Sequence, residues 1–110
     1  MANQKFFPIE SYNFQDVTYD HLMLEVTHRK WQGGMVLSAT PVHVTQFGYE
    51  QVYDWSSNPL TKGIDICVVP MVRMNRKRME AAFADLCGLA SRITELWNNR
   101  DFDGIKALFS

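Results

Sequence analysis

The sequence predicts an α+β domain in which an antiparallel sheet of about four strands packs against one long C-terminal helix, followed by a short final helix. Between residues 17 and 72 the apolar residues are mostly β-branched or aromatic and often alternate with polar ones, which is typical of strands. From residue 75 onward they recur at helical spacing. The chain has 110 residues, 46% of them hydrophobic, which suits a single globular domain over residues 1–110, strand-rich over 1–72 and helical over 75–109.

The first strand indicated by this alternation covers residues 22–28. Leu22, Leu24 and Val26 should face the core, while Glu25 faces the other way. The next six residues combine charged and polar side chains with two glycines, which is typical of a hairpin turn. Residues 35–39 are then expected to return as the neighbouring antiparallel strand.

Residues 41–55 allow two interpretations. As a helix, the segment would take Thr40 as its N-cap and Pro41 as its first-turn proline. As a strand, it uses its many Val, Thr, Phe and Tyr residues. We favour the strand, because Gly48 inside a helix would cost about 1 kcal/mol relative to alanine.

The next two segments are easier to assign. Residues 56–63 are rich in Ser, Asn, Pro and Gly, and are expected to form a loop. Residues 64–72 form a nearly continuous apolar run rich in β-branched side chains. Such a run predicts a central strand that is covered on both faces.

The long helix is expected to begin near Asn75, whose side chain can cap it, and to end near residue 98. On a helical wheel its apolar residues fall on one face, which should be buried. They are Met79, Ala82, Phe83, Leu86, Leu89, Ala90, Ile93, Leu96 and Trp97. Residues 102–109 predict one or two further helical turns, which would dock through Phe102, Ile105, Leu108 and Phe109.

Charge is distributed unevenly along the chain. The 11 basic and 12 acidic residues leave a net charge of −1, which excludes a globally basic nucleic-acid binder. The positive charges are nevertheless concentrated at the predicted helix start, where the helix dipole disfavours them. Free N–H groups beside Arg73, Arg76, Lys77 and Arg78 predict an anion site, which Tyr49 and Tyr53 could extend by stacking nucleic-acid bases.

A row of small residues on the predicted solvent face of the long helix is the second unusual feature. Ala81, Ala84, Gly88 and Ser91 recur at spacings of three and four, where lysine and glutamate are more usual. A second helix, from another copy, could lie against this row with Asp85 and Arg92 at its rim. The alternatives are that residues 102–109 fold back over the row, or that alanine is simply a good helix former there.

Motif spacings for catalysis or metal binding are absent from the sequence, so we expect no enzymatic activity, no cofactor and no metal. A nucleophilic pair of Cys67 with His43 is the one combination left open by spacing. Cys67 and Cys87 both lie in apolar runs, which predicts buried, reduced thiols. The chain shows no signal peptide and no membrane-spanning run, so we expect a cytoplasmic location.

The functional expectation is a non-enzymatic protein-binding or adaptor domain that acts as a homo-oligomer, most simply a dimer, and contacts another protein. It depends on the missing catalytic motifs, the small-residue row, and a surplus of aromatic and methionine residues that should leave apolar surface outside the core. The alternative is a protein that binds single-stranded nucleic acid or a phosphate ligand through the basic helix start. Neither interpretation involves a membrane.

Overall fold

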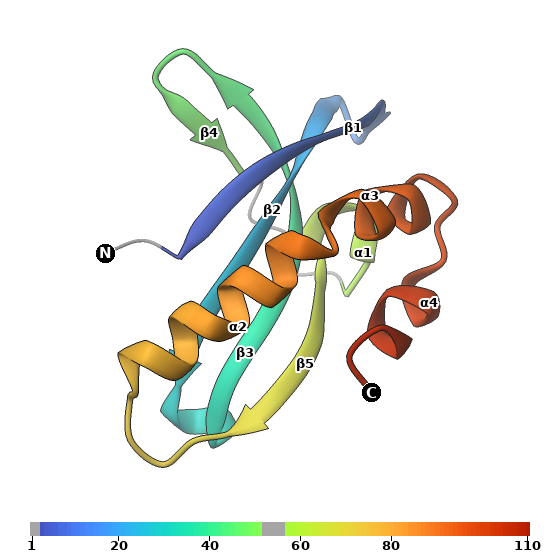
Figure 1. The fold of residues 1–110 in the computed structure, drawn as a ribbon. Helices are drawn as coiled ribbons and strands as arrows, with labels where there is room; N and C mark the ends of the chain where they lie inside the picture. The colour runs from blue at the N-terminus through green and yellow to red at the C-terminus, as the bar shows by residue number, and fades with distance from the viewer. Residues whose placement is uncertain (1–2, 52–56) are drawn as a thin grey trace.

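The computed structural model describes residues 3–51 and 57–110. It confirms the α+β class: a curled antiparallel sheet carries helices on one face (Figure 1). The strands are β1 (Gln4–Phe14), β2 (Val17–Arg29), β3 (Gly34–Thr45), β4 (Gly48–Glu50) and β5 (Ile64–Pro70). The helices are α1 (Pro59–Lys62), α2 (Arg76–Gly88), α3 (Ala90–Asn98) and α4 (Phe102–Ala107).

The predicted hairpin between residues 22–28 and 35–39 is confirmed as the centre of the sheet. β2 and β3 pair in continuous register from His21 opposite Val42 to Arg29 opposite Gly34. A 3-10 turn, η1 (Lys30–Gln32), and Gly33 at φ 74° connect them. Because side chains alternate along a strand, Leu22 and its companions face the helices, and Glu25 faces away from them.

β1 was not predicted from the sequence. It pairs with β2 alone among the described strands and therefore forms an edge. Pro8 obscures it in the sequence, since proline cannot donate a ladder hydrogen bond and is tolerated only where that donor faces outward. The register of β1 shifts between Pro8 and Tyr12, which marks the same irregularity.

The strand interpretation of residues 41–55 is confirmed over residues 41–45, but the segment does not continue as a single strand. β3 runs on to Thr45 with Pro41 buried inside it, and the chain then turns at Phe47 and returns as β4. Phe47 therefore occupies a turn and not a strand face, because the hairpin needs a reversal there. Residues 52–55 lie outside the described part of the chain.

The prediction of a central strand at residues 64–72 is wrong. β5 ends at Pro70 and pairs only with β3 among the described strands, so it forms the second edge. The strand buried on both faces is β3, whose residues from Gly34 to Val42 are all buried. The continuous apolar run predicted burial on both faces of this strand, but Val68, although apolar, is half-exposed on the outer face of the sheet.

The loop expected at residues 56–63 contains a short helical turn, α1. Asn58 caps it by accepting a hydrogen bond from the backbone N–H of Leu60, and Pro59 is its first residue. The tyrosine hydroxyl of Tyr12 donates to the carbonyl of Leu60 at 2.7 Å, which ties this turn to β1. The Asn-Pro pair is an N-cap signal that the turn-forming composition obscured.

The single long helix is replaced by two helices, α2 and α3, separated at Leu89. The predicted start is confirmed, since Asn75 caps α2 by accepting from the backbone N–H of Arg78 at 3.1 Å. α2 packs on β2 and β3, whereas α3 packs on β1 and α4 (Figure 1). The break therefore lets one apolar stripe cover two parts of a curled sheet.

The core confirms the predicted helix stripe and the docking tail. Met79, Leu86, Ala90, Ile93, Leu96 and Trp97 are buried in it, and Ala82, Phe83 and Leu89 pack against it. α4 packs on α3 and β5, where Ile105 is fully buried. Phe102, Leu108 and Phe109 border the core, and the Phe102 ring meets Trp97 edge-on at 5.1 Å.

Candidate interaction surface

The turn of the β2–β3 hairpin and the loop between β5 and α2 lie at the same end of the molecule (Figure 1), and each carries large apolar side chains that are exposed. Trp31 is 79% exposed, Val72 93% and Met74 64%. Soluble monomers rarely leave several large apolar residues together on the surface without a use for them. We call this surface the basic–apolar end; it comprises Lys30, Trp31, Val72, Arg73, Met74, Arg76, Lys77 and Arg78.

Two hydrogen bonds hold the two halves of the basic–apolar end together. The backbone N–H of Met71 donates to the carbonyl of Gly33 at 3.2 Å, and His28 Nε2 donates to the carbonyl of Met71 at 3.0 Å. Gly34 permits the close approach, because a Cβ there would lie 2.2 Å from the carbonyl oxygen of Val69. The hairpin tip and the β5–α2 loop therefore form one surface.

Exposed positive charges lie in the same segments as these apolar side chains. Residues 26–49 and 66–79 contain no acidic residue, and both segments contribute to this end. Arg73, Arg76, Lys77 and Arg78 are all exposed, and the described residues give none of them an ion-pair partner. Met74 and Arg76 also border a hollow of about 270 Å³ that is large enough for an apolar side chain. An apolar surface with positive charges beside it is complementary to an acidic partner with apolar anchors.

The structure separates the residues of the nucleic-acid interpretation. Tyr49 lies on β4, at the opposite end of the sheet from the start of α2 (Figure 1), and its ring packs against Phe6 at 5.1 Å. Tyr53 lies outside the described residues. The basic cluster and its expected stacking platform are therefore not brought together, because β3 turns back at Phe47 instead of running on toward the helix start.

The predicted oligomer contact is fully on the surface. Ala81, Ala84, Asp85, Gly88, Ser91 and Arg92 are all exposed, and a Cβ added to Gly88 would meet nothing within 4 Å. The alternative in which residues 102–109 fold over this row is wrong, since α4 docks on the other side of α3, against β5. The break at Leu89 divides the row between α2 and α3.

The thiol–imidazole pair of Cys67 with His43, which residue spacing alone left open, does not form. Cys67 lies opposite Leu37 on β3, whereas His43 is six residues farther along that strand, about 20 Å away. His43 instead contacts Asp20, at 2.6 Å between Nδ1 and Oδ2. Burial raises the pKa of the Cys87 thiol above its ordinary value, although Lys5 acts in the opposite direction.

Asp20 is the centre of a polar cluster that no sequence motif announced. Its carboxylate accepts from His21 Nδ1 at 2.8 Å, from His43 Nδ1, and from the backbone N–H of Val44 at 3.0 Å. Burial alone would raise the pKa of Asp20, but these hydrogen bonds outweigh burial and hold it below the ordinary 3.8. The cluster links β2 to the far end of β3. The described residues form no group of three metal-ligating side chains in suitable geometry.

Comparisons with protein-family models, with curated proteins and with solved structures find no significant match to this chain. Among the helices of the described residues, none is long and apolar enough to cross a membrane.

Proposed function

We propose that this protein is a non-enzymatic binding domain that contacts another protein through the basic–apolar end. The proposal depends on the exposure of Trp31 in the hairpin turn and of Val72 and Met74 in the adjoining β5–α2 loop, together with Arg73, Arg76, Lys77 and Arg78, which have no ion-pair partner among the described residues. Burying such side chains supplies the affinity of a contact, while the neighbouring charges select an acidic partner and speed its approach. The free thiols of Cys67 and Cys87 favour a reducing, cytoplasmic setting for this contact.

A protein partner is favoured over nucleic acid for two reasons. Single-strand binders usually stack several bases on aromatic side chains beside their positive groove, whereas Trp31 is the one exposed aromatic that the described residues place at this end, and Tyr49 lies far from it. Apolar side chains such as Val72 and Met74 contribute little to phosphate recognition but are typical of protein contacts. Binding of nucleic acid is therefore the alternative that the experiment must distinguish from binding of a protein.

The test is capture from a lysate of the native host with the double variant Val72→Ser/Met74→Ser. We expect the variant to lose the proteins that the wild type captures, because each lost apolar anchor weakens a contact by roughly 1–2 kcal/mol. The control is Phe47→Ser, in the β3–β4 turn at the opposite end of the molecule. Phe47 is about as exposed as Val72, and this variant should capture the same proteins as the wild type.

Identification of the captured proteins and nuclease treatment complete the experiment. The proposal requires that a captured protein, once purified, bind the wild type directly, more weakly in high salt, and bind the double variant poorly. The proposal is refuted if nuclease treatment abolishes capture, or if the double variant captures the same proteins as the Phe47→Ser control.

We also propose, as a second function of the same molecule, self-association through the row on α2 and α3. Gly88, the last residue of α2, has open space around it and no side chain, so another helix could approach the backbone closely there. Asp85 and Arg92, of opposite charge, flank the row and could pair across a two-fold axis.

A further inference from the structure

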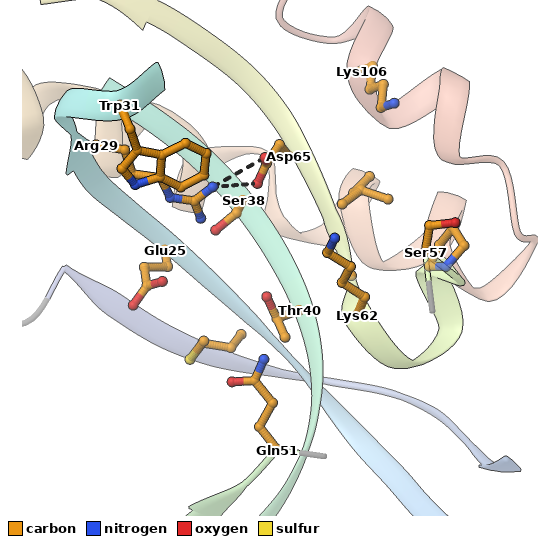
Figure 2. Close-up of a pocket in the computed structure, with 14 residues that line it drawn as sticks. Glu25, Arg29, Trp31, Ser38, Thr40, Gln51, Ser57, Lys62, Asp65 and Lys106 are labelled. Carbon is orange, nitrogen blue, oxygen red and sulfur yellow. Dashed lines mark hydrogen bonds and ion pairs between the residues drawn. The ribbon is translucent and has the colours of Figure 1, made fainter. Parts of the chain in front are cut away.

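A second candidate site lies on the face of the sheet that is turned away from α2 and α3. It is a hollow of about 720 Å³, within the range of small-ligand pockets in proteins. Figure 2 shows Glu25 on one side and Lys62 on the other, with Ser38 and Thr40 between them and the Gln51 amide below. None of these five residues belongs to the basic–apolar end.

The strand register builds the floor of this hollow. Gln4, Glu25, Ser38 and Asp65 lie opposite one another on β1, β2, β3 and β5, so their side chains form one polar row across four strands. Thr40 lies one row farther along β3, on the same face as Ser38. The row is a product of pairing and is invisible in the linear sequence.

The two hydroxyl residues of the floor are buried but unpartnered. Ser38 is 3% exposed and Thr40 is 8% exposed, and both line the hollow. Neither hydroxyl makes a hydrogen bond to the described residues, and neither oxygen is among the fully buried side-chain atoms that lack a partner. The small accessible part of each residue therefore opens into the hollow, where its hydroxyl is available to a ligand.

The charges of the hollow are only partly neutralised within the protein. Arg29 donates to both carboxylate oxygens of Asp65 at 3.2 Å, so that carboxylate is already paired. Glu25 is half-buried, and its one hydrogen bond among the described residues is accepted from the neutral amide of Gln4. Lys62 and Lys106 are exposed and have no ion-pair partner among the described residues. The lining of the hollow thus includes one half-buried carboxylate and two ammonium groups that are not paired with one another.

The wall that carries Lys62 is held firmly against the floor. Gly63, at φ 82°, follows Lys62 and lies so close to β3 that a Cβ there would be 2.3 Å from the carbonyl oxygen of Ala39 and 2.8 Å from Thr40 Cα. The Asn58 cap and the Tyr12 hydroxyl hold α1 from the other side. Lys62 therefore projects from a fixed turn, which is what a preorganised site requires.

We propose that this hollow binds a small zwitterion, an amino acid or short peptide that carries a free ammonium and a free carboxylate group. Its ammonium would bind Glu25, its carboxylate would bind Lys62 with Lys106 nearby, and its polar atoms would satisfy Ser38 and Thr40. A saccharide would satisfy the hydroxyls equally well but gives no reason for unpaired charges of opposite sign in the lining. The site is independent of the proposed protein contact, apart from Trp31, which borders both.

The experiment measures binding of defined probes to the purified protein by ligand-observed NMR. The probes are the free amino acids, dialanine and trialanine, each alanine peptide also in N-acetylated and in C-amidated form, and maltose. We expect at least one zwitterion to bind at millimolar concentration or better. Capping either end should weaken binding about ten-fold, because a charge-assisted hydrogen bond is lost.

Two variants assign the ends of the ligand. Glu25→Gln should weaken the zwitterion about ten-fold and leave the N-acetylated form unaffected, since that form has no ammonium to lose. Lys62→Met should likewise weaken binding of the zwitterion about ten-fold, and it should leave the C-amidated form unaffected, since that form has no carboxylate to lose. The matched controls are Glu80→Gln on α2 and Lys5→Met on β1, two exposed positions outside the hollow, which should bind as the wild type does.

Each of three results would overturn the proposal: no probe binds at millimolar concentration, a capped peptide binds as tightly as its zwitterion, or maltose binds in place of the zwitterions. Both hollow variants should capture the same proteins as the wild type in the lysate experiment. The failure of one proposal therefore leaves the other standing.

Discussion

At the scale of single residues, the informative positions are those where the contacts or the exposure of a side chain could not be predicted from the residues next to it in the sequence. Asp20 has no motif around it, yet it joins three donors from two strands. Ser38 is one polar residue within a buried strand, and only the register with Glu25 and Asp65 gives it a role. Trp31 lies in a stretch whose polar and glycine residues predict only a turn, and its side chain is 79% exposed.

The Asp20 cluster predicts a specific dependence of stability on pH. Because its pKa in the folded protein lies below the ordinary 3.8, its contribution is fully present above that value and is lost as the pH falls through the lower folded pKa. Asp20→Asn should therefore reduce the free energy of unfolding by roughly 1–3 kcal/mol at neutral pH. Denaturant unfolding of both proteins at several pH values measures this, and the difference should shrink below pH 3.8.

Glu80→Gln is the matched control, since Glu80 is exposed, lies outside the small-residue row and makes no hydrogen bond or ion pair among the described residues. A difference between wild type and Asp20→Asn that stays constant into strong acid would contradict a role for the Asp20 charge.

At the scale of elements, local signals decided where helices begin and tertiary contacts decided where they end. Asn75 is a conventional cap, and the helix starts where the sequence places it. The end near residue 98 was also expected, but the break at Leu89 was not, because the apolar stripe continues through it. The break follows from the sheet, whose curl requires α3 to turn toward β1.

The cap of α2 gives a prediction at this scale. Asn75→Ala should lower the free energy of unfolding by about 1 kcal/mol, because the N–H of Arg78 loses its acceptor. Thermal or denaturant unfolding measures the loss. Asn99→Ala, at an exposed asparagine whose side chain caps nothing, should change stability less. Equal losses in the two variants would show that the Asn75 cap contributes nothing specific.

At the scale of the whole molecule, three surfaces face different directions: the basic–apolar end, the small-residue row on α2 and α3, and the hollow on the opposite face of the sheet. The near-neutral total charge conceals this arrangement. Residues 1–55 carry 3 basic and 6 acidic side chains, a net of −3, whereas residues 56–110 carry 8 and 6, a net of +2. The positive excess lies mainly at one end.

Self-association is tested on the intact protein by size-exclusion chromatography with light scattering. We expect the wild type to dimerise in the range of tens of micromolar. Gly88→Arg should be monomeric, because a long charged side chain would fill the space that a second helix needs. Gly88→Ala is the matched variant and should remain dimeric with unchanged or slightly higher stability. A wild type that stays monomeric would end this proposal.

By itself, the sequence determined the α+β class, the central hairpin with its inward-facing side chains, the start of α2 and the buried stripe that follows it. These features depend on periodicity and capping, which act between residues close in the chain. Only the tertiary structure decided which strands form the edges, where the long helix divides, and which side chains meet in the hollow. Glu25, Ser38 and Lys62 come from three elements, and strand pairing between distant segments, which no local pattern encodes, brings them together.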